Sequence, residues 1–353
     1  MSGLPSWLLL LIFLASAVVI WMSGVKLSDT TDVLAERLHL GSALGGLVLL
    51  AVATNLPEIA ITVSAALSHQ LDVAVGNILG GIAVQTVVLV ALDAFGIRAR
   101  KPLTYQAASL VLVLEGALVV AVLLIVVAGS QLPASLLTAR LTPDVVIIAV
   151  VWVIGLLLIN RASGHLPWSD SGDAPDTQPE ARGTRRTKKE AAATKKGMST
   201  GRAAVVFAVS ALATLVAGVT IERSGERFFG NLGLSGILFG STVLAIATSL
   251  PELSTGITST RMGDYQLAIG DIFGGNAFLP VLFLPATVLA GDAVLPAAGR
   301  SDIYLTALGA LLTVIYMAGL IFRPSKQIAR MGVDSIVVLF VYLLGIVGLI
   351  ALQ

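Results

Sequence analysis

The chain has 353 residues, of which 56% are hydrophobic and only 12% are charged, against about 25% charged residues in soluble globular domains. Its mean hydropathy of +0.93 indicates an integral membrane protein. A formal net charge of +1 gives no support for nucleic-acid binding, and the absence of cysteine excludes disulfides, thiolate metal sites and cysteine catalysis.

Ten apolar segments are long enough to cross a bilayer, which takes about 20 residues. They lie at residues 5–24, 40–68, 71–95, 104–128, 143–160, 203–222, 234–261, 265–290, 302–322 and 333–352. A polar stretch rich in Pro, Gly, Thr and charge separates the fifth segment from the sixth and is unable to bury a core. We therefore predict an all-α membrane protein with a five-helix repeat at 1–160, a cytoplasmic linker at 161–202 and a second five-helix repeat at 203–353.

The second and seventh segments carry the same motif, TNLPE at 54–58 and TSLPE at 248–252. Between residues 46–58 and 240–252, 8 of 13 positions are identical at a constant offset of 194. The same offset places Gly80-Gly81 on Gly274-Gly275 in the following segments. Because each half has an odd number of segments, the second copy enters the membrane in the opposite direction, which predicts an inverted repeat.

The distribution of basic residues predicts the orientation. With the N-terminus outside, 18 of the 22 Lys and Arg residues fall on the inner side, leaving Arg140, Arg223, Arg227 and Arg300 outside. Cytoplasmic loops of membrane proteins carry an excess of Lys and Arg. We therefore expect a multi-pass cell-membrane protein with both termini extracytoplasmic and the central linker cytoplasmic.

The repeated motif combines a helix-breaking proline with an intramembrane carboxylate. Pro57 and Pro251 each leave the carbonyl four residues earlier without its helical donor, and irregular backbone at membrane depth is tolerated only inside protein or along a cavity. Glu58 and Glu252 follow in the first turn of the restarting helices. Two facing carboxylates repel unless a cation or proton lies between them. A single copy is compatible with a proline kink and a satisfied glutamate, but two copies in register favour an all-oxygen site for a hard cation such as Ca²⁺.

The doubled motif, with G-N-x-x-G about twenty residues later, resembles the cation/calcium exchanger superfamily, in particular prokaryotic sodium/calcium exchanger membrane proteins. The resemblance implies no enzymatic activity and no cofactor, but antiport of Ca²⁺ for Na⁺ or H⁺ by alternating access. It implies broken helices at segments two, three, seven and eight around the ion site, with segments one and six sliding against this core. Carried over by position, the candidate metal-binding residues are Glu58, Glu252, Thr54, Thr248, Asn55, Ser249, Gln85 and Asp271. The last two stand where the family usually has asparagine.

The chain departs from the family's usual G-S-N-I-F-N run in the third segment and its counterpart in the eighth. Both serines are replaced by glycine, at Gly81 and Gly275, and the second terminal asparagine is replaced by Leu279. Oxygen atoms assigned to Na⁺ are therefore lost while the central carboxylates remain, which predicts weak dependence on Na⁺ and coupling to protons. A transporter of another cation and a cation-binding membrane protein that does not transport are the alternatives, and the sequence assigns no oligomeric state.

Other polar residues within the apolar segments have simpler interpretations. Glu115 lies in the middle of the fourth segment. We expect either a protonated or paired contact between helices or a role in transport. We expect Asp93 to be a solvated end of a span, and Asp72 and Asp264 to begin helices, where negative groups are favourable. All three histidines fall in loops or at segment ends, which argues against a catalytic or metal-binding histidine in the core.

Overall fold

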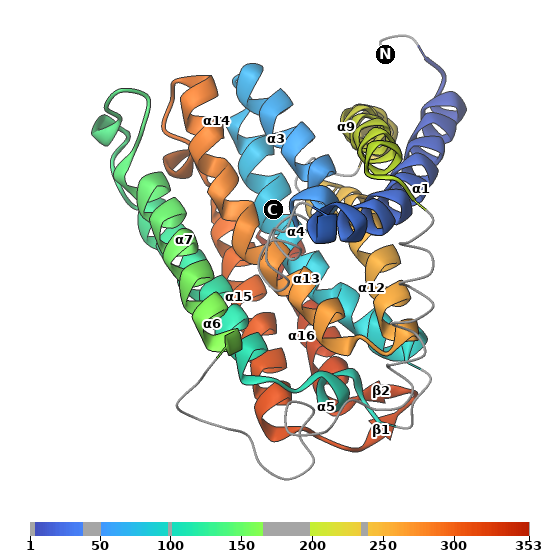
Figure 1. Ribbon diagram of the computed structural model, residues 1–353. Coiled ribbons are helices and arrows are strands. Elements are labelled where there is room, and N and C mark those ends of the chain that lie inside the picture. Colours follow the sequence, from blue (N-terminus) through green and yellow to red (C-terminus); the bar gives the residue numbers. More distant parts are fainter. Residues whose placement is uncertain (1–3, 38–50, 98–100, 165–197, 234–238, 353) are drawn as a thin grey trace.

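The computed structural model describes residues 4–37, 51–97, 101–164, 198–233 and 239–352. Within these ranges the chain is almost entirely helical (Figure 1). The first half contains α1 (Ser6–Arg37), α3 (Leu56–Leu67), α4 (Leu71–Ala91), α5 (Leu103–Ala107), α6 (Leu110–Gly129) and α7 (Pro143–Gly164). The second half contains α9 (Thr200–Asn231), α11 (Ala245–Thr248), α12 (Leu250–Met262), α13 (Tyr265–Phe278), α14 (Phe283–Ala290), α15 (Arg300–Phe322) and α16 (Val333–Ala351), with a short antiparallel hairpin of β1 (Gln327–Ile328) and β2 (Met331–Gly332) before α16.

Eight helical segments are long and apolar enough to cross a membrane: α1, α4 with its π-helical extension to Gly96, α6, α7, α9, α13 with α14, α15 and α16. They coincide with eight of the ten predicted segments. The other two, residues 40–68 and 234–261, lie partly outside the described residues, and their described parts form the shorter helices α3, α11 and α12. A multi-helical membrane protein is thus confirmed, while the count of ten stays a prediction, as does the domain division, because most of residues 161–202 lies outside the described ranges.

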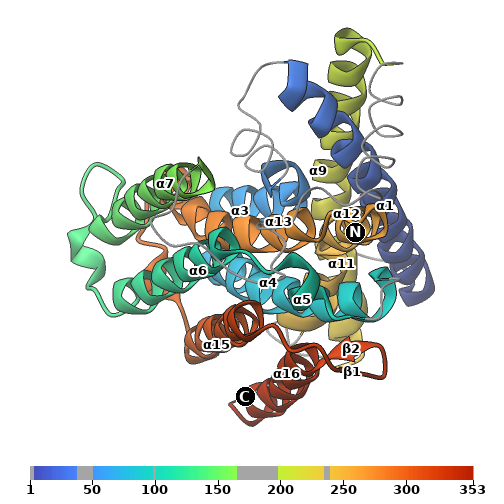
Figure 2. The ribbon, with the colours of Figure 1, turned by 60° about the horizontal axis from the view of Figure 1, so that its bottom comes forward.

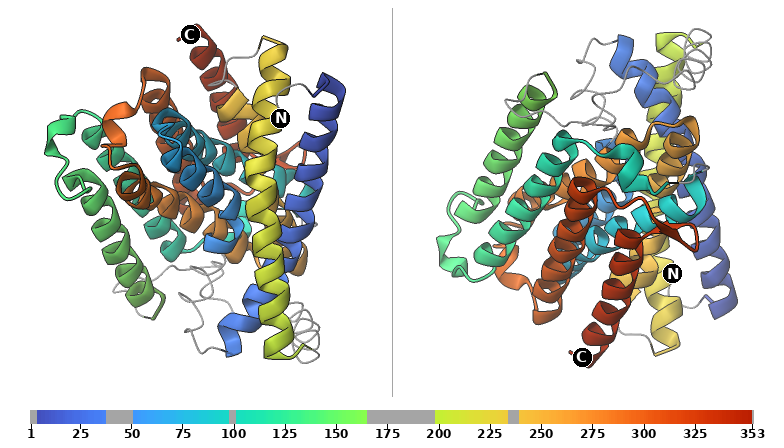
Figure 3. Two further views of the ribbon diagram at one scale, coloured as in Figure 1. Left: turned by 90° about the horizontal axis from the view of Figure 1, so that it is seen from above. Right: turned by 90° about the horizontal axis from the view of Figure 1, so that it is seen from below.

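Two helices are longer than the others and pair with each other. Helices α1 and α9 have 32 residues each, which at 1.5 Å per residue gives roughly 48 Å. They lie side by side at one edge of the molecule, with α7 at the opposite edge (Figures 1 and 3). Figure 2 shows them running across the direction of α3 and α13. The helices α4, α6, α13 and α15 pack together behind them around fully buried side chains such as Ile78, Phe273 and Tyr316.

The helix interruptions follow the prolines. Helix α3 begins directly after a turn at Asn55 and α12 directly after a turn at Ser249, with proline in the first turn of each. The eighth segment changes to a tight 3₁₀ turn at Leu279–Leu282, which contains Pro280. The expected break in the third segment is wrong, because α4 runs without interruption from Leu71 to Ala91. That segment has no proline, so every backbone N–H can continue the helix.

Asp93 is a buried anchor and not the solvated span end expected from the sequence. Its side chain is 1% exposed. One carboxylate oxygen accepts a hydrogen bond from the backbone N–H of Leu103 at 2.8 Å, and the other accepts from the N–H of Gly332 at 2.6 Å and the Ser335 hydroxyl at 2.7 Å. The prediction was wrong because these donors arrive from α5 and from the junction of β2 with α16. The expected helix start at Asp264 is confirmed, since this residue caps α13 by accepting from the N–H of Leu267 at 3.1 Å.

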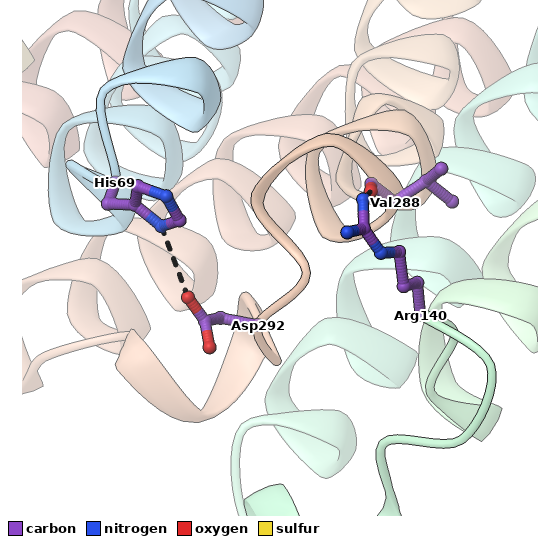
Figure 4. Close-up of polar contacts among 4 residues, drawn as sticks. All are labelled: His69, Arg140, Val288 and Asp292. Carbon is purple, nitrogen blue, oxygen red and sulfur yellow. Dashed lines mark hydrogen bonds and ion pairs between the residues drawn. The ribbon is translucent and has the colours of Figure 1, made fainter.

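The last turn of α14 and the loop after it each make one contact with the first half of the chain. His69 Nδ1 lies 3.3 Å from Asp292 Oδ2, and Arg140 Nη1 donates to the carbonyl of Val288 at 3.3 Å (Figure 4). The His69 and Asp292 side chains are 67% and 61% exposed, and exposed pairs contribute little to stability. His69 therefore lies at a loop, as predicted, and away from the buried carboxylates.

Candidate ion-binding site

The carboxyl groups of the two motif glutamates lie beside the same side-chain amide, that of Gln85. Glu58, in the first turn of α3, and Glu252, in the first turn of α12, are both 0% exposed. The side-chain nitrogen of Gln85, on α4, lies 3.4 Å from Oε1 of Glu58 and 3.4 Å from Oε1 of Glu252. It also donates to Asn55 Oδ1 at 2.9 Å. Residues from both halves of the chain are thus brought together in a fully buried polar cluster.

The threonines of the motif cross between the halves. The Thr248 hydroxyl lies beside the Glu58 carboxyl, and the Thr54 hydroxyl lies beside the Glu252 carboxyl. Each hydroxyl also lies 3.3 Å from a backbone carbonyl of its own segment, three residues earlier. Each glutamate carboxyl therefore lies beside a hydroxyl from the other copy of the motif. The constant offset between the copies does not predict this exchange of partners.

Asp271 extends the cluster on one side only. This carboxyl, on α13, is 2% exposed, lies close enough to Glu252 for electrostatic repulsion, and accepts from the Thr255 hydroxyl at 2.8 Å. At the corresponding position of the first half, Asn77 donates to the backbone carbonyl of Glu58 at 3.3 Å. The two halves of the cluster thus differ by one carboxylate.

Asn55 and Ser249 follow the threonines at the two breaks. Both are buried, and both donate to the backbone carbonyl four residues earlier at 2.7 Å. Asn55 also reaches the centre through its bond to Gln85, whereas the Ser249 hydroxyl donates within its own segment. Of the eight residues carried over by position, seven thus share contacts around Gln85 and the glutamates, and Ser249 lies next to them in the chain.

Several oxygen atoms of the cluster have no hydrogen-bond donor in the described part of the chain: Glu58 Oε2, Glu252 Oε2, Gln85 Oε1, Asp271 Oδ1 and Asn276 Oδ1. Asn276 was not predicted from the sequence. It is fully buried on α13 and links the halves by donating to the Thr86 hydroxyl at 3.0 Å. The sequence feature that could have identified Asn276 is an amide at the position that corresponds, at the offset of 194, to the apolar Ile82 of the first half. Buried acceptors without donors are costly, and a bound cation or proton would satisfy them.

The glycines that replace the expected serines differ in their surroundings. A Cβ atom at Gly275 would lie 2.8 Å from Asn55 Nδ2, so the Asn55 amide fills the space of a side chain there. A Cβ atom at Gly81 would lie 3.9 Å from Leu279 Cδ1, an ordinary van der Waals contact. One missing hydroxyl has therefore been replaced by an amide and the other by apolar surface.

The described residues contain no group of three or more His, Cys, Asp and Glu side chains arranged to hold a metal ion. An ion at this cluster would need amide, hydroxyl and carbonyl oxygens beside its carboxylates. Such mixed oxygen sets are ordinary for Ca²⁺, which takes six to eight oxygen ligands in flexible geometry.

The helices that carry the two glutamates differ in polarity. Four positions of α12 carry buried hydroxyls where α3, at the offset of 194, carries apolar side chains: Ser254 for Ala60, Thr255 for Ile61, Ser259 for Ala65 and Thr260 for Ala66. A cavity of about 300 Å³ borders the apolar helix, between Ile61, Ser64 and Ala65 of α3 and Glu222, Arg223, Glu226 and Arg227 of α9, with Gln70 and Val73. Ile61 lies one helical turn from Glu58, so α3 separates this cavity from the cluster by a single apolar turn.

Glu115, the second unexpected acid of the sequence, is also buried. It lies on α6 at 5% exposure, and its Oε2 has no donor among the described residues. The next residue, Gly116, packs on Met317 and Phe273. An isolated carboxyl inside a membrane is costly, and no paired helix contact within the described residues accounts for it.

A family profile described as sodium/calcium exchanger protein matches residues 8–171 and 199–351, covering both halves and both copies of the motif. The chain belongs to this family. It is 28% identical over 313 residues to inner membrane protein YrbG of Escherichia coli (strain K12), covering 87% of each chain. It is 27% identical over 303 residues to putative antiporter CaxA of Alkalimonas amylolytica, covering 83% of this chain and 85% of the relative.

Solved structures of exchangers share the fold. The crystal structure of the H⁺/Ca²⁺ exchanger CAX superposes with a TM-score of 0.66 at 15% identity, covering 99% of this chain and 82% of that one. A structure of the sodium-calcium exchanger NCX_Mj superposes with a TM-score of 0.60 at 16% identity, covering 97% of this chain and 99% of that one. The resemblance to the cation/calcium exchanger superfamily seen in the sequence is thus confirmed, and the protein is a multi-pass member of an exchanger family.

Proposed function

We propose that this protein is a secondary-active antiporter that carries Ca²⁺ across the membrane in exchange for another cation, with Glu58 and Glu252 as the shared ligands. One observation carries the proposal. Two fully buried glutamates, one from each copy of the motif, lie 3.4 Å from the same Gln85 nitrogen, and each keeps one oxygen without a donor. A divalent cation between them would satisfy both carboxylates and cancel their charge.

The Gln85 amide must reorient when the ion binds. Its N–H group now points at both glutamates, and an N–H donor and a cation repel one another. Rotation of the amide would present Gln85 Oε1, which has no donor in the described part of the chain, as a further ligand. The proposed ligand set is therefore Glu58 and Glu252 at the centre, with Thr54, Thr248, Asn55, Ser249, Gln85 and Asp271 around them, to which the geometry adds Asn276.

An inverted repeat with alternating access is the proposed architecture. Its support is the reciprocity of the contacts, since Thr248 reaches Glu58 and Thr54 reaches Glu252. Such pairs are what a two-fold relation between equivalent elements produces. Because Ca²⁺ and the counter-cation would use the same carboxylates, only one can be bound at a time, and this competition enforces exchange. We further propose both termini outside and the linker inside, from the distribution of basic residues.

Protons are our proposed counter-ion. Gly81, Gly275 and Leu279 remove oxygens that the family resemblance assigns to Na⁺, and the Asn55 amide occupies the space beside Gly275. When Ca²⁺ leaves, protonation is the remaining way to neutralise facing carboxylates in a medium of low dielectric constant. The fold is shared with both a sodium-calcium exchanger and an H⁺/Ca²⁺ exchanger, so it is compatible with either counter-ion.

The test is ⁴⁵Ca efflux from loaded proteoliposomes containing the purified protein. One set of vesicles receives an inward Na⁺ gradient at fixed pH, and the other receives a pH gradient in buffer without Na⁺. We expect the pH gradient to drive the larger flux, with protein carrying Glu58→Gln and Glu252→Gln together as the inactive control. Saturable Na⁺-driven efflux without a response to pH would refute proton coupling but support Ca²⁺ antiport. Equal leakage from wild-type, control and protein-free vesicles would refute transport of Ca²⁺ itself.

A further inference from the structure

The two long helices each touch the motif of the opposite half through a glycine. A Cβ atom at Gly24 of α1 would lie 2.8 Å from Cα of Pro251, and one at Gly218 of α9 would lie 3.0 Å from Cα of Pro57. Both distances are to backbone atoms: the one at Gly24 is too short for a real Cβ contact, and the one at Gly218 is tighter than most. A Cβ atom would therefore require the proline backbone to shift at Gly24 and to give by a few tenths of an ångström at Gly218, which glycine avoids.

The two contacts are equivalent. Gly218 follows Gly24, and Pro251 follows Pro57, by the same offset of 194 residues that relates the motifs. The first half's α1 packs on the second half's α12, and the second half's α9 packs on the first half's α3. In both cases the contacted proline directly precedes a glutamate of the cluster. Any displacement of α1 or α9 is thus applied to the backbone next to Glu252 or Glu58.

Close packing of small residues is common between membrane helices, so other glycines of the same helix provide the comparison. Gly201 and Gly230 of α9 have nothing within 4 Å of an added Cβ atom among the described residues, whereas Gly225 would meet the side chains of Phe239 and Phe13. Among these four glycines of α9, close approach to backbone atoms of another helix is found at Gly218, next to the proline.

We propose that Gly24 and Gly218 are positioning residues through which movement of α1 and α9 is transmitted to the ion cluster, an inference that rests on the proposed antiport. Because glycine has no side chain, each long helix can move along the proline of the opposite half without a steric clash at this contact. An added methyl group would lodge against the Cα atom of the proline, which cannot rotate away as a side chain could. The hydrogen-bond partners of the two glutamate carboxyls include Gln85 and the motif threonines, which lie on other helices than α1 and α9, so ion affinity should survive while turnover falls.

The experiment compares Gly24→Ala and Gly218→Ala with Gly201→Ala and Gly230→Ala. Equilibrium ⁴⁵Ca binding in detergent and ⁴⁵Ca flux in proteoliposomes are measured for each variant. We expect the first two to keep their dissociation constants within about threefold and to lose at least about tenfold in turnover, a difference of about 1.4 kcal/mol in the barrier. The control variants should retain both. Wild-type turnover in both Gly24→Ala and Gly218→Ala would overturn the proposal, as would a loss of binding equal to the loss of turnover.

A second measurement does not depend on Ca²⁺ being the cargo. The chain has no cysteine, so spin labels can be placed uniquely at Leu232, beyond the end of α9, and at Leu132, after α6, which are 69% and 38% exposed. The inter-label distance distribution of the wild type should contain at least two populations in liposomes, and Gly218→Ala should reduce them to one. Identical distributions for wild type and Gly218→Ala would overturn the proposal. Failure of Ca²⁺ transport by the wild type would instead count against the proposed function alone.

Discussion

Asn55 and Gly275 occupy two positions where the family resemblance leads us to expect serine. We predict that substitutions at these two positions have coupled effects on stability. A Cβ atom at residue 275 would lie 2.8 Å from Asn55 Nδ2, and Asn55 cannot move without cost. Its Nδ2 donates to Ala51 at 2.7 Å and its Oδ1 accepts from Gln85 at 2.9 Å. Overpacking of this kind costs about 1–3 kcal/mol, and loss of one buried hydrogen bond costs about 1 kcal/mol. We therefore expect Gly275→Ser to destabilise the protein by about 2 kcal/mol.

Asn55→Ser removes the obstructing amide, so the double variant should recover most of that loss. The expected coupling energy is about 1–2 kcal/mol, within the range for residues in contact. Unfolding of the purified protein in detergent can be followed through its four tryptophans. The matched control is Gly81→Ser, whose Cβ atom would meet only Leu279 Cδ1 at 3.9 Å. Whatever this variant costs in stability, the cost should be the same in the presence of Asn55 and of Asn55→Ser, because the two residues share no contact at that position. Equal stability of Gly275→Ser and wild type, or additive effects in the double variant, would refute the reasoning.

Two further predictions concern the carboxylates and the topology. Glu58→Gln and Glu252→Gln should each reduce Ca²⁺ flux by at least about tenfold, because a hydrogen bond or ligand contact to a charged group contributes about 1.5–3 kcal/mol, while the protein still inserts. Asp271→Asn, which gives the residue found at the first-half position, should be far milder, and near-normal flux in either glutamine variant would place the site elsewhere. Cysteines introduced at Ser2 and Thr187 should react with impermeant reagents from opposite sides of intact cells, and labelling from one side would contradict the inverted topology.

The sequence predicted the cluster's carboxylates but not the way they are connected. TNLPE and TSLPE mark the glutamates and the helix starts because proline acts locally on the backbone. Gln85, in contrast, contacts Glu58 and Glu252, which lie 27 and 167 positions away in the chain. Its central place follows from the packing of α4 against α3 of the first half and against α11 and α13 of the second half. Asp93 was misread for the same reason, since its donor Gly332 is 239 residues distant. Local rules located the breaks, whereas long-range contacts decided which polar groups are solvated.

The unequal polarity of α3 and α12 means that the two entrances to a nearly symmetric site need not be equivalent. Helix α12 has buried hydroxyls at Ser254, Thr255, Ser259 and Thr260, whereas α3 has a buried hydroxyl at Thr62 and one at Ser64 beside the cavity. In the proposed antiport, an ion passing α12 would meet more hydroxyl groups of the helix itself than an ion passing α3. Substrate affinities measured from the two sides of the membrane should therefore differ. The direction of net flux would still be fixed by the gradients, so in the proposed antiporter the difference between the two copies of the motif would affect rates and not the equilibrium.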